Sequence, residues 1–357
     1  MSDHVGKSSR AFSENHVSER LDRRTATQLL GSLLASCCLP APAATAARLS
    51  LLNVSYDATR ELYEAINPQF VARWLAQTGT QLTIQQSHGG SGMQARAIIA
   101  GLQADVATLG TAYDMVQLYR QAALIPATWA TRLPNNSAPY TSTVVFLVRK
   151  GNPKNLRDWE DLIRPGVQVI SPNPKSSSGA RLNYLAAWAW AMKRPGASDA
   201  SAKRFVQQLY QHVPVLDSGA RGSTNTFVER GIGDVLLAWE SEALLAKAKI
   251  GADKVEVVLP SLSILAEPPV TLVDKYVARH GTRAAAQAYL EFLYTPLGQR
   301  IIAQNFFRPR DPDAQRQFQA QFPPVNMVTV DQFFGGWEQA QRVHFEDGAT
   351  FDQIYGQ

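Results

Sequence analysis

The α/β part of the chain opens with the stretch Leu51-Leu52-Asn53-Val54-Ser55-Tyr56-Asp57-Ala58-Thr59. Its first four residues form a short apolar run, which predicts a β-strand. A helical pattern follows, because apolar residues recur every four positions from Leu62 to Trp74. Pro68 interrupts this pattern, so we expect either a kink or two short helices.

Two more predicted strands follow, at residues 81–84 and 105–109. Between them, we expect a helix that is capped by Ser91 and ends before Gly101. Strands that alternate with helices of this length are typical of parallel βαβ units. The sequence therefore predicts the α/β class.

A second region begins after a polar, Pro-rich segment at residues 133–139, where a continuous apolar strand runs from Thr143 to Val148. Strand and helix patterns alternate again up to Trp239. We expect the helix after Glu240 to return to the first region, and the segment near residue 308 to cross once more. The expected division is 48–132 plus 241–307 for lobe one, and 133–240 plus 308–357 for lobe two.

Residues 1–47 have the composition of a leader. Arg23-Arg24 precedes a short, mildly apolar run, and Ala44-Thr45-Ala46 offers a small-residue cleavage site. This order predicts an export signal that resembles the twin-arginine type. Leu34-Ala35-Ser36-Cys37 resembles a lipoprotein processing site, so a lipid anchor through Cys37 is an alternative. A disordered tail is a third interpretation.

The composition excludes several classes of protein. Hydrophobic residues make up 45% and charged residues 18% of the 357 residues, which is typical of globular chains. The formal net charge is only +5, and no dense Lys/Arg run indicates nucleic-acid binding. The cysteines are Cys37 and Cys38 alone, so cleavage after Ala46 would leave no thiol for catalysis, disulfides or metal binding.

Four predicted strand-to-helix junctions are rich in Gly, Ser or Thr. They are residues 55–57, 87–92, 176–180 and 217–224. Free N–H groups at a helix start, together with the helix dipole, favour an anion. Because such junctions lie at the carboxyl ends of the strands, we expect a ligand site there.

Motifs for other chemistry are missing from the sequence. GxxxxGK[ST], HExxH and GxSxG do not occur, and the six histidines are scattered. We therefore expect no metal, no cofactor and no catalytic triad, and we interpret His88 as a loop donor or packing residue. Trp239 ends an apolar strand, so its indole either packs in the core or points its N–H into the cleft.

The junction sequences resemble those of the periplasmic sulfate-binding proteins of ABC importers, a family that delivers sulfate or thiosulfate. The resemblance covers residues 50–355 and rests on long, unusual blocks. These blocks include 51–57, 86–92, 139–143, 172–176, 216–224, 264–268, 307–311, 334–337 and 351–355.

This resemblance implies a fold, a function and a site. The fold is a type II solute-binding protein, with two α/β lobes, each a mainly parallel sheet flanked by helices, and a hinge between them. The function is that of a periplasmic, monomeric, non-enzymatic receptor that delivers its anion to the membrane subunits of an ABC importer. The implied donors are the backbone N–H groups of Asp57, Ser178, Gly179 and Ala220, the hydroxyl of Ser91 and the indole N–H of Trp239. The family usually has glycine at position 178, so the Ser178 amide can serve only if its φ stays negative.

A site made of donors alone suits sulfate, because sulfate has no proton to donate at neutral pH. Hydrogen phosphate would need an acceptor, and leaving a charged group unpaired costs about 1–3 kcal/mol or more. If the carboxylate of Asp57 faced the cleft, the site would favour a protonated anion instead. The alternatives are a receptor for phosphate, molybdate or an organosulfonate, a sulfate or phosphate ester hydrolase, and an interaction protein that keeps the fold.

Overall fold

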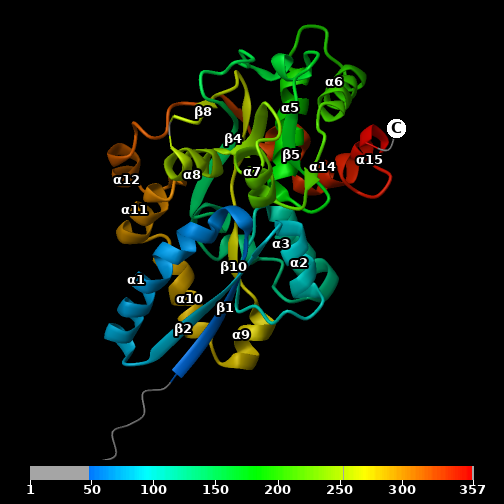
Figure 1. The fold of residues 1–357 in the computed structure, drawn as a ribbon. Coiled ribbons are helices and arrows are strands. Elements are labelled where there is room, and N and C mark those ends of the chain that lie inside the picture. The colour runs from blue at the N-terminus through cyan, green and yellow to red at the C-terminus, as the bar shows by residue number, and fades with distance from the viewer. Residues whose placement is uncertain (1–47, 252, 356–357) are drawn as a thin grey trace, which may run out of the picture. The chain divides into compact units, whose positions relative to one another are not determined.

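The computed structural model describes residues 48–251 and 253–355, which form two α/β lobes (Figure 1). The predicted leader, with Cys37, lies outside the described residues. No helix in the described part of the chain is both long and apolar enough to cross a membrane.

We use lobe one for the smaller sheet with the helices that cover it, and lobe two for the larger sheet with its helices. Lobe one contains β1 (Arg48–Tyr56), β2 (Gln81–Gly89), β3 (Val106–Thr108) and β10 (Val270–Leu272), with η1 (Asp57–Thr59), α1 (Arg60–Thr78), α2 (Ser91–Ile99), α3 (Ala112–Ala122), α9 (Asp274–His280) and α10 (Arg283–Phe292). Lobe two contains β4 (Tyr140–Arg149), β5 (Val169–Pro172), β6 (Leu216–Asp217), β7 (Val235–Trp239), β8 (Val255–Val258), β9 (Ser263–Ala266), β11 (Arg308–Pro309) and β12 (Met327–Val328), with η3 (Trp159–Ile163), α5 (Ser178–Met192), α6 (Asp199–Gln211), α7 (Ala220–Val228) and α8 (Glu240–Ile250). The remaining elements are η2 (Trp129–Thr131), α4 (Pro134–Ser137), α11 (Pro296–Gln304), α12 (Pro312–Gln317), α13 (Val330–Phe334), α14 (Trp337–His344) and α15 (Thr350–Tyr355).

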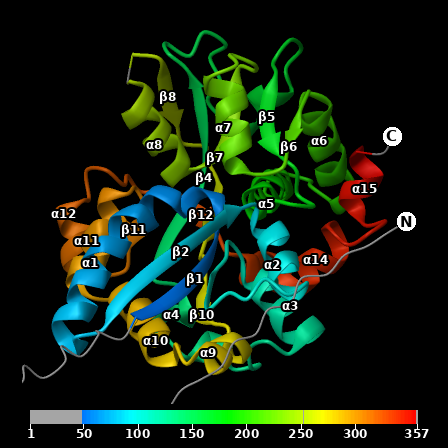
Figure 2. The same ribbon diagram turned by 60° about the horizontal axis from the view of Figure 1, so that its bottom comes forward.

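The sheet of lobe one has the strand order β10-β3-β1-β2. β1 runs parallel to both β2 and β3, and β10 is antiparallel to β3. Figures 1 and 2 both show α1 on one side of β1 and β2, with α2 and α3 on the other. The predicted βαβ units are confirmed in this lobe.

The sheet of lobe two has the order β12-β9-β4-β7-β5-β6 and is built around β4. β4 runs antiparallel to β7, β8, β9 and β11, whereas β5 is parallel to β6 and β7. β4 is buried from Tyr140 to Val148, and it is continuously apolar from Val144 to Val148, as is typical of a strand covered on both faces. The predicted strand at residues 143–148 is confirmed, and it extends to both sides.

We expected the chain to return to lobe one at residue 241, but the strand pairing indicates a later return. After α8, the strands β8 and β9 still pair with β4 of lobe two. β10 is the first later strand to pair in lobe one, where it joins β3. The pairing therefore favours a division near residues 267–269, and this boundary remains a proposal.

Two local expectations need correction. Of the two alternatives at Pro68, two short helices are contradicted, because residues 60–78 form one continuous helix that contains Pro68. Pro68 lies on the exposed side, where water can satisfy the carbonyl that lacks its N–H partner. Ser91 does not cap α2, because Gly90 is the N-cap and Ser91 is the first helical residue.

Candidate anion-binding site

The four predicted junctions all open helices, and all four line one small cavity between the lobes. The carboxyl ends of β1 and β2 face those of β5, β6 and β7 across it. The cavity has a volume of about 10 Å³. Its lining consists of Tyr56, Asp57, Ala58, Gly90, Ser91, Ser177, Ser178, Gly179, Ala220 and Trp239. All six residues named from the sequence are thus brought together, and no Lys, Arg or His is among these described lining residues.

The start of α5 supplies free backbone donors. Ser178 and Gly179 occupy the first two helical positions, where N–H groups have no partner inside the helix. Neither N–H makes a hydrogen bond to another described residue. Ser177 is the N-cap, and its hydroxyl accepts from the N–H of Ala180 at 3.4 Å. The first turn of α5 therefore directs two amides and a helix dipole at the cavity.

Ser178 meets the condition that its amide requires. It is not among the described residues with positive φ, so a side chain fits its backbone conformation. Space for that side chain comes from Gly110 of lobe one. A Cβ atom on Gly110 would lie 1.9 Å from the Ser178 Oγ and 2.7 Å from its Cβ. The missing side chain at Gly110 thus lets the lobes meet around Ser178.

Trp239 presents an indole N–H to the same cavity. The side chain is only 2% exposed, yet its Nε1 has no hydrogen-bond partner among the described residues. A Cβ atom on Gly179 would lie 2.9 Å from this Nε1, so glycine is needed for the close approach. A buried donor without a partner is costly, at about 1–3 kcal/mol, which favours a ligand at this atom.

Ser91 lines the cavity, but its hydroxyl has other partners in this structure. The Ser91 Oγ donates to the Asp114 Oδ2 at 2.6 Å and accepts from the Gly110 N–H at 2.8 Å. The expectation that this hydroxyl serves as an anion donor therefore needs a rotation away from Asp114. Thr111 also donates to the same Oδ2, at 2.9 Å, so Asp114 would keep a donor.

The carboxylate of Asp57 extends toward lobe two. A Cβ atom on Gly219 would lie 2.0 Å from its Oδ2. Burial raises the pKa of this carboxyl above its usual value, and the positive charges of Arg60 and Arg221 offset this rise only in part. The Asp57 N–H, at the start of η1, has no partner among the described residues, as the amide role requires.

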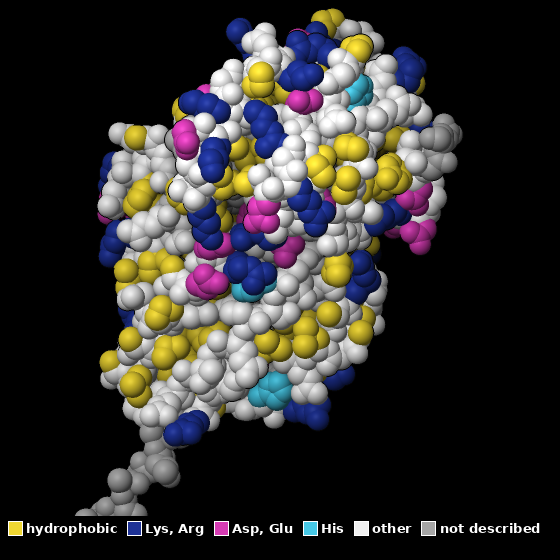
Figure 3. Space-filling view, in the orientation of Figure 1, with side chains coloured by type: hydrophobic (Ala, Val, Ile, Leu, Met, Phe, Trp, Pro, Cys, Tyr) yellow, Lys and Arg dark blue, Asp and Glu magenta, His cyan; other side chains and the backbone are white. Residues whose placement is uncertain are grey.

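Ion pairs join the lobes beside the cavity. On one side, the Arg181 Nη1 of α5 lies 3.0 Å from the Asp114 Oδ1 of α3, and both side chains are almost fully buried. On the other side, Arg221 of α7 contacts both carboxylate oxygens of Glu61 in α1, at 2.9 and 2.8 Å. Lys249 of α8 lies 2.5 Å from Glu61. Figure 3 shows acidic and basic side chains close together across the middle of one face.

The pKa values of these groups follow from the pairing. Burial raises the pKa of Glu61, but hydrogen bonds from Arg221 and Lys249 outweigh burial and lower it to about 2. Burial raises the pKa of Glu242, which is only partly offset by Arg221 at 3.2 Å. The Glu61 carboxylate is thus held charged in the closed arrangement.

His88 lies outside the cavity lining. Its Nδ1 is 2.6 Å from the Ser55 Oγ, and burial together with the charge of Arg60 lowers its pKa to about 4. The described residues contain no group of three or more His, Cys, Asp or Glu side chains placed to hold a metal ion.

The six residues named from the sequence leave out several that shape the site, although two of these, Ser177 and Gly90, lie in the predicted junctions 176–180 and 87–92. Ser177 lines the cavity next to Ser178, and Gly90 and Gly110 allow close contact between the lobes. Asp114 and Glu61 provide the carboxylates that meet Arg181 and Arg221. Gly90 belongs to a glycine-rich run, which is a sequence signal for close backbone approach. The ion pairs have no such signal in the sequence, because their partners are distant in the chain.

The sequence model of the bacterial extracellular solute-binding proteins matches residues 51–308. The chain belongs to this family. It is 58% identical over 316 residues to the sulfate-binding protein of Escherichia coli (strain K12), covering 88% of this chain and 96% of that protein. It is 50% identical over 324 residues to the thiosulfate-binding protein of Pseudomonas aeruginosa, covering 91% and 97%.

A solved structure of the same kind supports the fold. The sulfate-binding protein SubI from Mycobacterium tuberculosis H37Rv aligns with a TM-score of 0.75 and 33% identity. The alignment covers 84% of this chain and all of SubI. The predicted family and the two-lobed solute-binding fold are therefore confirmed.

Proposed function

We propose that this protein binds sulfate outside the cytoplasmic membrane and delivers it to the membrane subunits of an ABC importer. The observation that carries the proposal is the cavity where four helix starts meet the unpartnered indole N–H of Trp239. These groups are donors, and no cationic side chain lines the cavity among the described residues. Such a site suits a fully deprotonated oxyanion, because that anion only accepts hydrogen bonds and needs no acceptor in the site.

Thiosulfate is a second candidate ligand, because it shares the tetrahedral shape and the lack of a proton. The thiosulfate-binding relative supports it, at 50% identity over nearly the whole chain. Phosphate and molybdate have no relative that favours them among those compared above. Donors without a nucleophile and base pair also favour a receptor over an ester hydrolase.

The enclosure of the ligand supports the proposed transfer to a membrane partner. An anion enclosed between two closed lobes leaves only when the lobes open, and a membrane partner that prefers the open form would release it. We further propose that the protein acts as a monomeric receptor without a catalytic step.

The test is a titration of the purified full chain with sulfate after exhaustive removal of anions. Trp239→Phe removes the indole N–H, and loss of a hydrogen bond to a charged group, about 1.5–3 kcal/mol, predicts sulfate affinity lower by roughly 10- to 100-fold. The melting temperature and tryptophan fluorescence report binding, with thiosulfate and phosphate beside sulfate.

Trp159→Phe is the matched control. Trp159 is fully buried in lobe two, and its Nε1 donates to the Leu262 carbonyl at 2.8 Å, away from the cavity. This variant should lose stability but keep its sulfate affinity. Equal affinities in the two variants, or a stronger response to phosphate than to sulfate, would contradict the proposed function.

A further inference from the structure

A second, larger cavity lies beside the cleft, with a volume of about 280 Å³. It is bounded by α2 and α3 of lobe one, by α5 and the loop before it, and by α14 and the segment after it. Its walls include Gly92, Arg96, Tyr113, Lys175, Arg181 and Gln341. Unlike the first cavity, it presents guanidinium groups.

Two of these guanidinium groups converge from opposite lobes. A Cβ atom on Gly92 would lie 3.1 Å from the Arg181 Nη2, 3.4 Å from the Ser176 carbonyl oxygen and 3.6 Å from the Arg96 Nη1. Both nitrogens therefore approach one point, and the absence of a side chain at Gly92 keeps that point open. Asp114 compensates the charge of Arg181, so the uncompensated charge at this point is that of Arg96.

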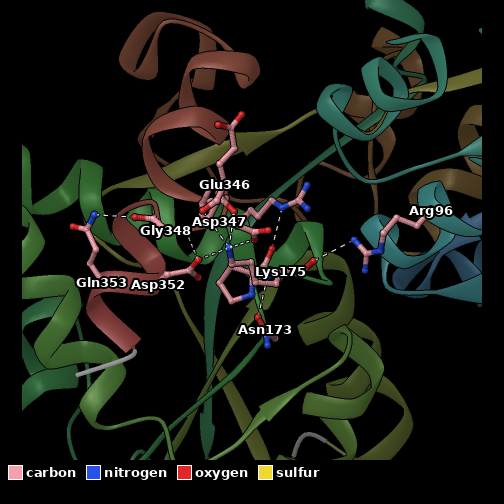
Figure 4. Close-up of polar contacts among 11 residues, drawn as sticks. Arg96, Asn173, Lys175, Glu346, Asp347, Gly348, Asp352 and Gln353 are labelled. Atoms are coloured by element: carbon pink, nitrogen blue, oxygen red, sulfur yellow. Dashed lines mark hydrogen bonds and ion pairs between the residues drawn. The ribbon is translucent and has the colours of Figure 1, made fainter. Parts of the chain in front are cut away.

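The carboxylates around the cavity do not neutralise Arg96. Asp114 is held by Arg181 at 3.0 Å, and Asp347 by Lys175 at 3.2 Å. Figure 4 shows the carboxylate of Glu346 pointing away from Arg96, whose guanidinium reaches toward the loop of Lys175. The hydrogen bond of Arg96 in the described chain goes to the Lys175 carbonyl at 3.5 Å.

Buried polar groups also face this cavity. Arg181 is 4% exposed, and its Nη2 makes no hydrogen bond to a described residue, while its Nε and Nη1 are occupied by Pro174 and Asp114. Gln341 is 7% exposed, and its Oε1 has no partner in the described part of the chain. Because the two amide ends of a glutamine can be exchanged, Gln341 can offer an N–H₂ donor there.

We propose that Arg96 and Arg181 form a second oxyanion site, distinct from the donor-only cavity, which bridges α2 and α5 when the lobes are closed. Its ligand is an inorganic tetrahedral oxyanion such as sulfate or phosphate. Guanidinium groups bind oxyanions through paired N–H donors and do not discriminate by protonation. Because Arg96 is exposed to solvent, we expect binding in the millimolar range, and the occupant stabilises the closed lobes because it contacts both.

The experiment measures the melting temperature of the full chain against the logarithm of sulfate concentration, at constant ionic strength. A single site gives a constant slope once it is saturated, and a second site doubles the slope when its own range is reached. The wild type should show this doubling in the millimolar range. Arg96→Gln should retain the one-site slope and the tight sulfate binding.

Arg73→Gln is the control, because Arg73 is an exposed arginine on α1 of the same lobe. It should behave as the wild type. Inorganic phosphate, added at millimolar concentration to protein already saturated with micromolar sulfate, should raise the melting temperature of the wild type and of Arg73→Gln, but not of Arg96→Gln.

A constant slope in the wild type, or identical behaviour of Arg96→Gln and Arg73→Gln, would overturn this site. The two proposals fail separately. If micromolar sulfate has no effect while millimolar phosphate still acts through Arg96, the proposed function is wrong and the second site stands.

Discussion

Ser178 and Gly110 form a pair across the lobes. The Ser178 side chain occupies the space that a Cβ atom on Gly110 would need. Each residue alone fits its own backbone, since neither has a positive φ among the described residues. Their fit therefore concerns lobe closure and not the folding of either lobe.

We expect Gly110→Ala to weaken sulfate binding at least about tenfold, because overpacking costs about 1–3 kcal/mol and falls on the closed state. Adding Ser178→Gly should restore affinity, since it removes both atoms with which the new methyl group collides. Calorimetric titration of the two single variants and the double variant measures the coupling. Additive effects would show that the two residues act independently.

At this scale, the sequence predicted residues that line the cavity, while their role as anion donors stays a prediction. It did not predict the contact by which Gly110 makes room for Ser178. The junctions were predicted from local sequence patterns, and the family resemblance indicated individual residues within or next to them. These residues, which line the cavity, are Asp57, Ser178, Gly179, Ala220 and Trp239. Gly110 follows a predicted strand, but its contact with Ser178 joins distant parts of the chain. The sequence also did not predict that the Ser91 hydroxyl donates to Asp114, a contact that occupies the expected anion donor in this structure.

At the scale of elements, the helices around the cavity are held together by charge. Glu61 of α1 meets Arg221 of α7 and Lys249 of α8, both of which lie in lobe two. Opening of the lobes would separate Glu61 from both cations. The cluster therefore acts on the equilibrium between open and closed forms more than on the stability of either lobe.

We expect Glu61→Gln to lower sulfate affinity by roughly tenfold, and salt to weaken the wild type more than this variant. The measurement is the sulfate dissociation constant at several salt concentrations. Glu256→Gln is the control, because Glu256 pairs with Lys150 inside lobe two, at 2.9 Å. Equal salt dependence in wild type and Glu61→Gln would contradict this role.

The same pair predicts a pH dependence. The pKa of Glu61 is about 2 when paired, against an ordinary value of about 4.5. A lowered pKa stabilises the closed form fully above the ordinary value, and this contribution is lost as pH falls from about 4.5 toward 2. Between neutral pH and pH 5, the pair should therefore leave the affinity unchanged.

The order of elements was largely predictable, because apolar runs and helix starts are local. The strands of lobe one and the helix after Ser178 appear where the patterns indicate. The point at which the chain returns to lobe one was not predictable, because β8 and β9 pair with β4 through contacts between residues distant in the sequence. The alternative of two short helices around Pro68 was wrong for a related reason, because packing of the buried face of α1 outweighs one lost hydrogen bond.

At the scale of the whole receptor, closure depends on backbone approach at Gly90. A Cβ atom there would lie 2.7 Å from the Ser176 carbonyl oxygen and 2.8 Å from that of Ser218. These two loops of lobe two are tied together, because the Ser176 hydroxyl donates to the Ser218 carbonyl at 2.8 Å. Backbone atoms held in this way cannot move aside as a flexible side chain would.

We expect Gly90→Ala to block closure while leaving both lobes folded. Gly90 has φ −57° and ψ 131°, a conformation that alanine adopts freely, so the obstacle exists only when the lobes meet. Small-angle scattering should show that sulfate makes the wild type more compact and leaves the variant unchanged. The sulfate affinity of the variant should be lower than that of the wild type. Gly89→Ala is the matched control, since its Cβ would make ordinary contacts with Gln94 at 3.5 Å. Compaction of Gly90→Ala with sulfate would mean that the closed state does not require this contact.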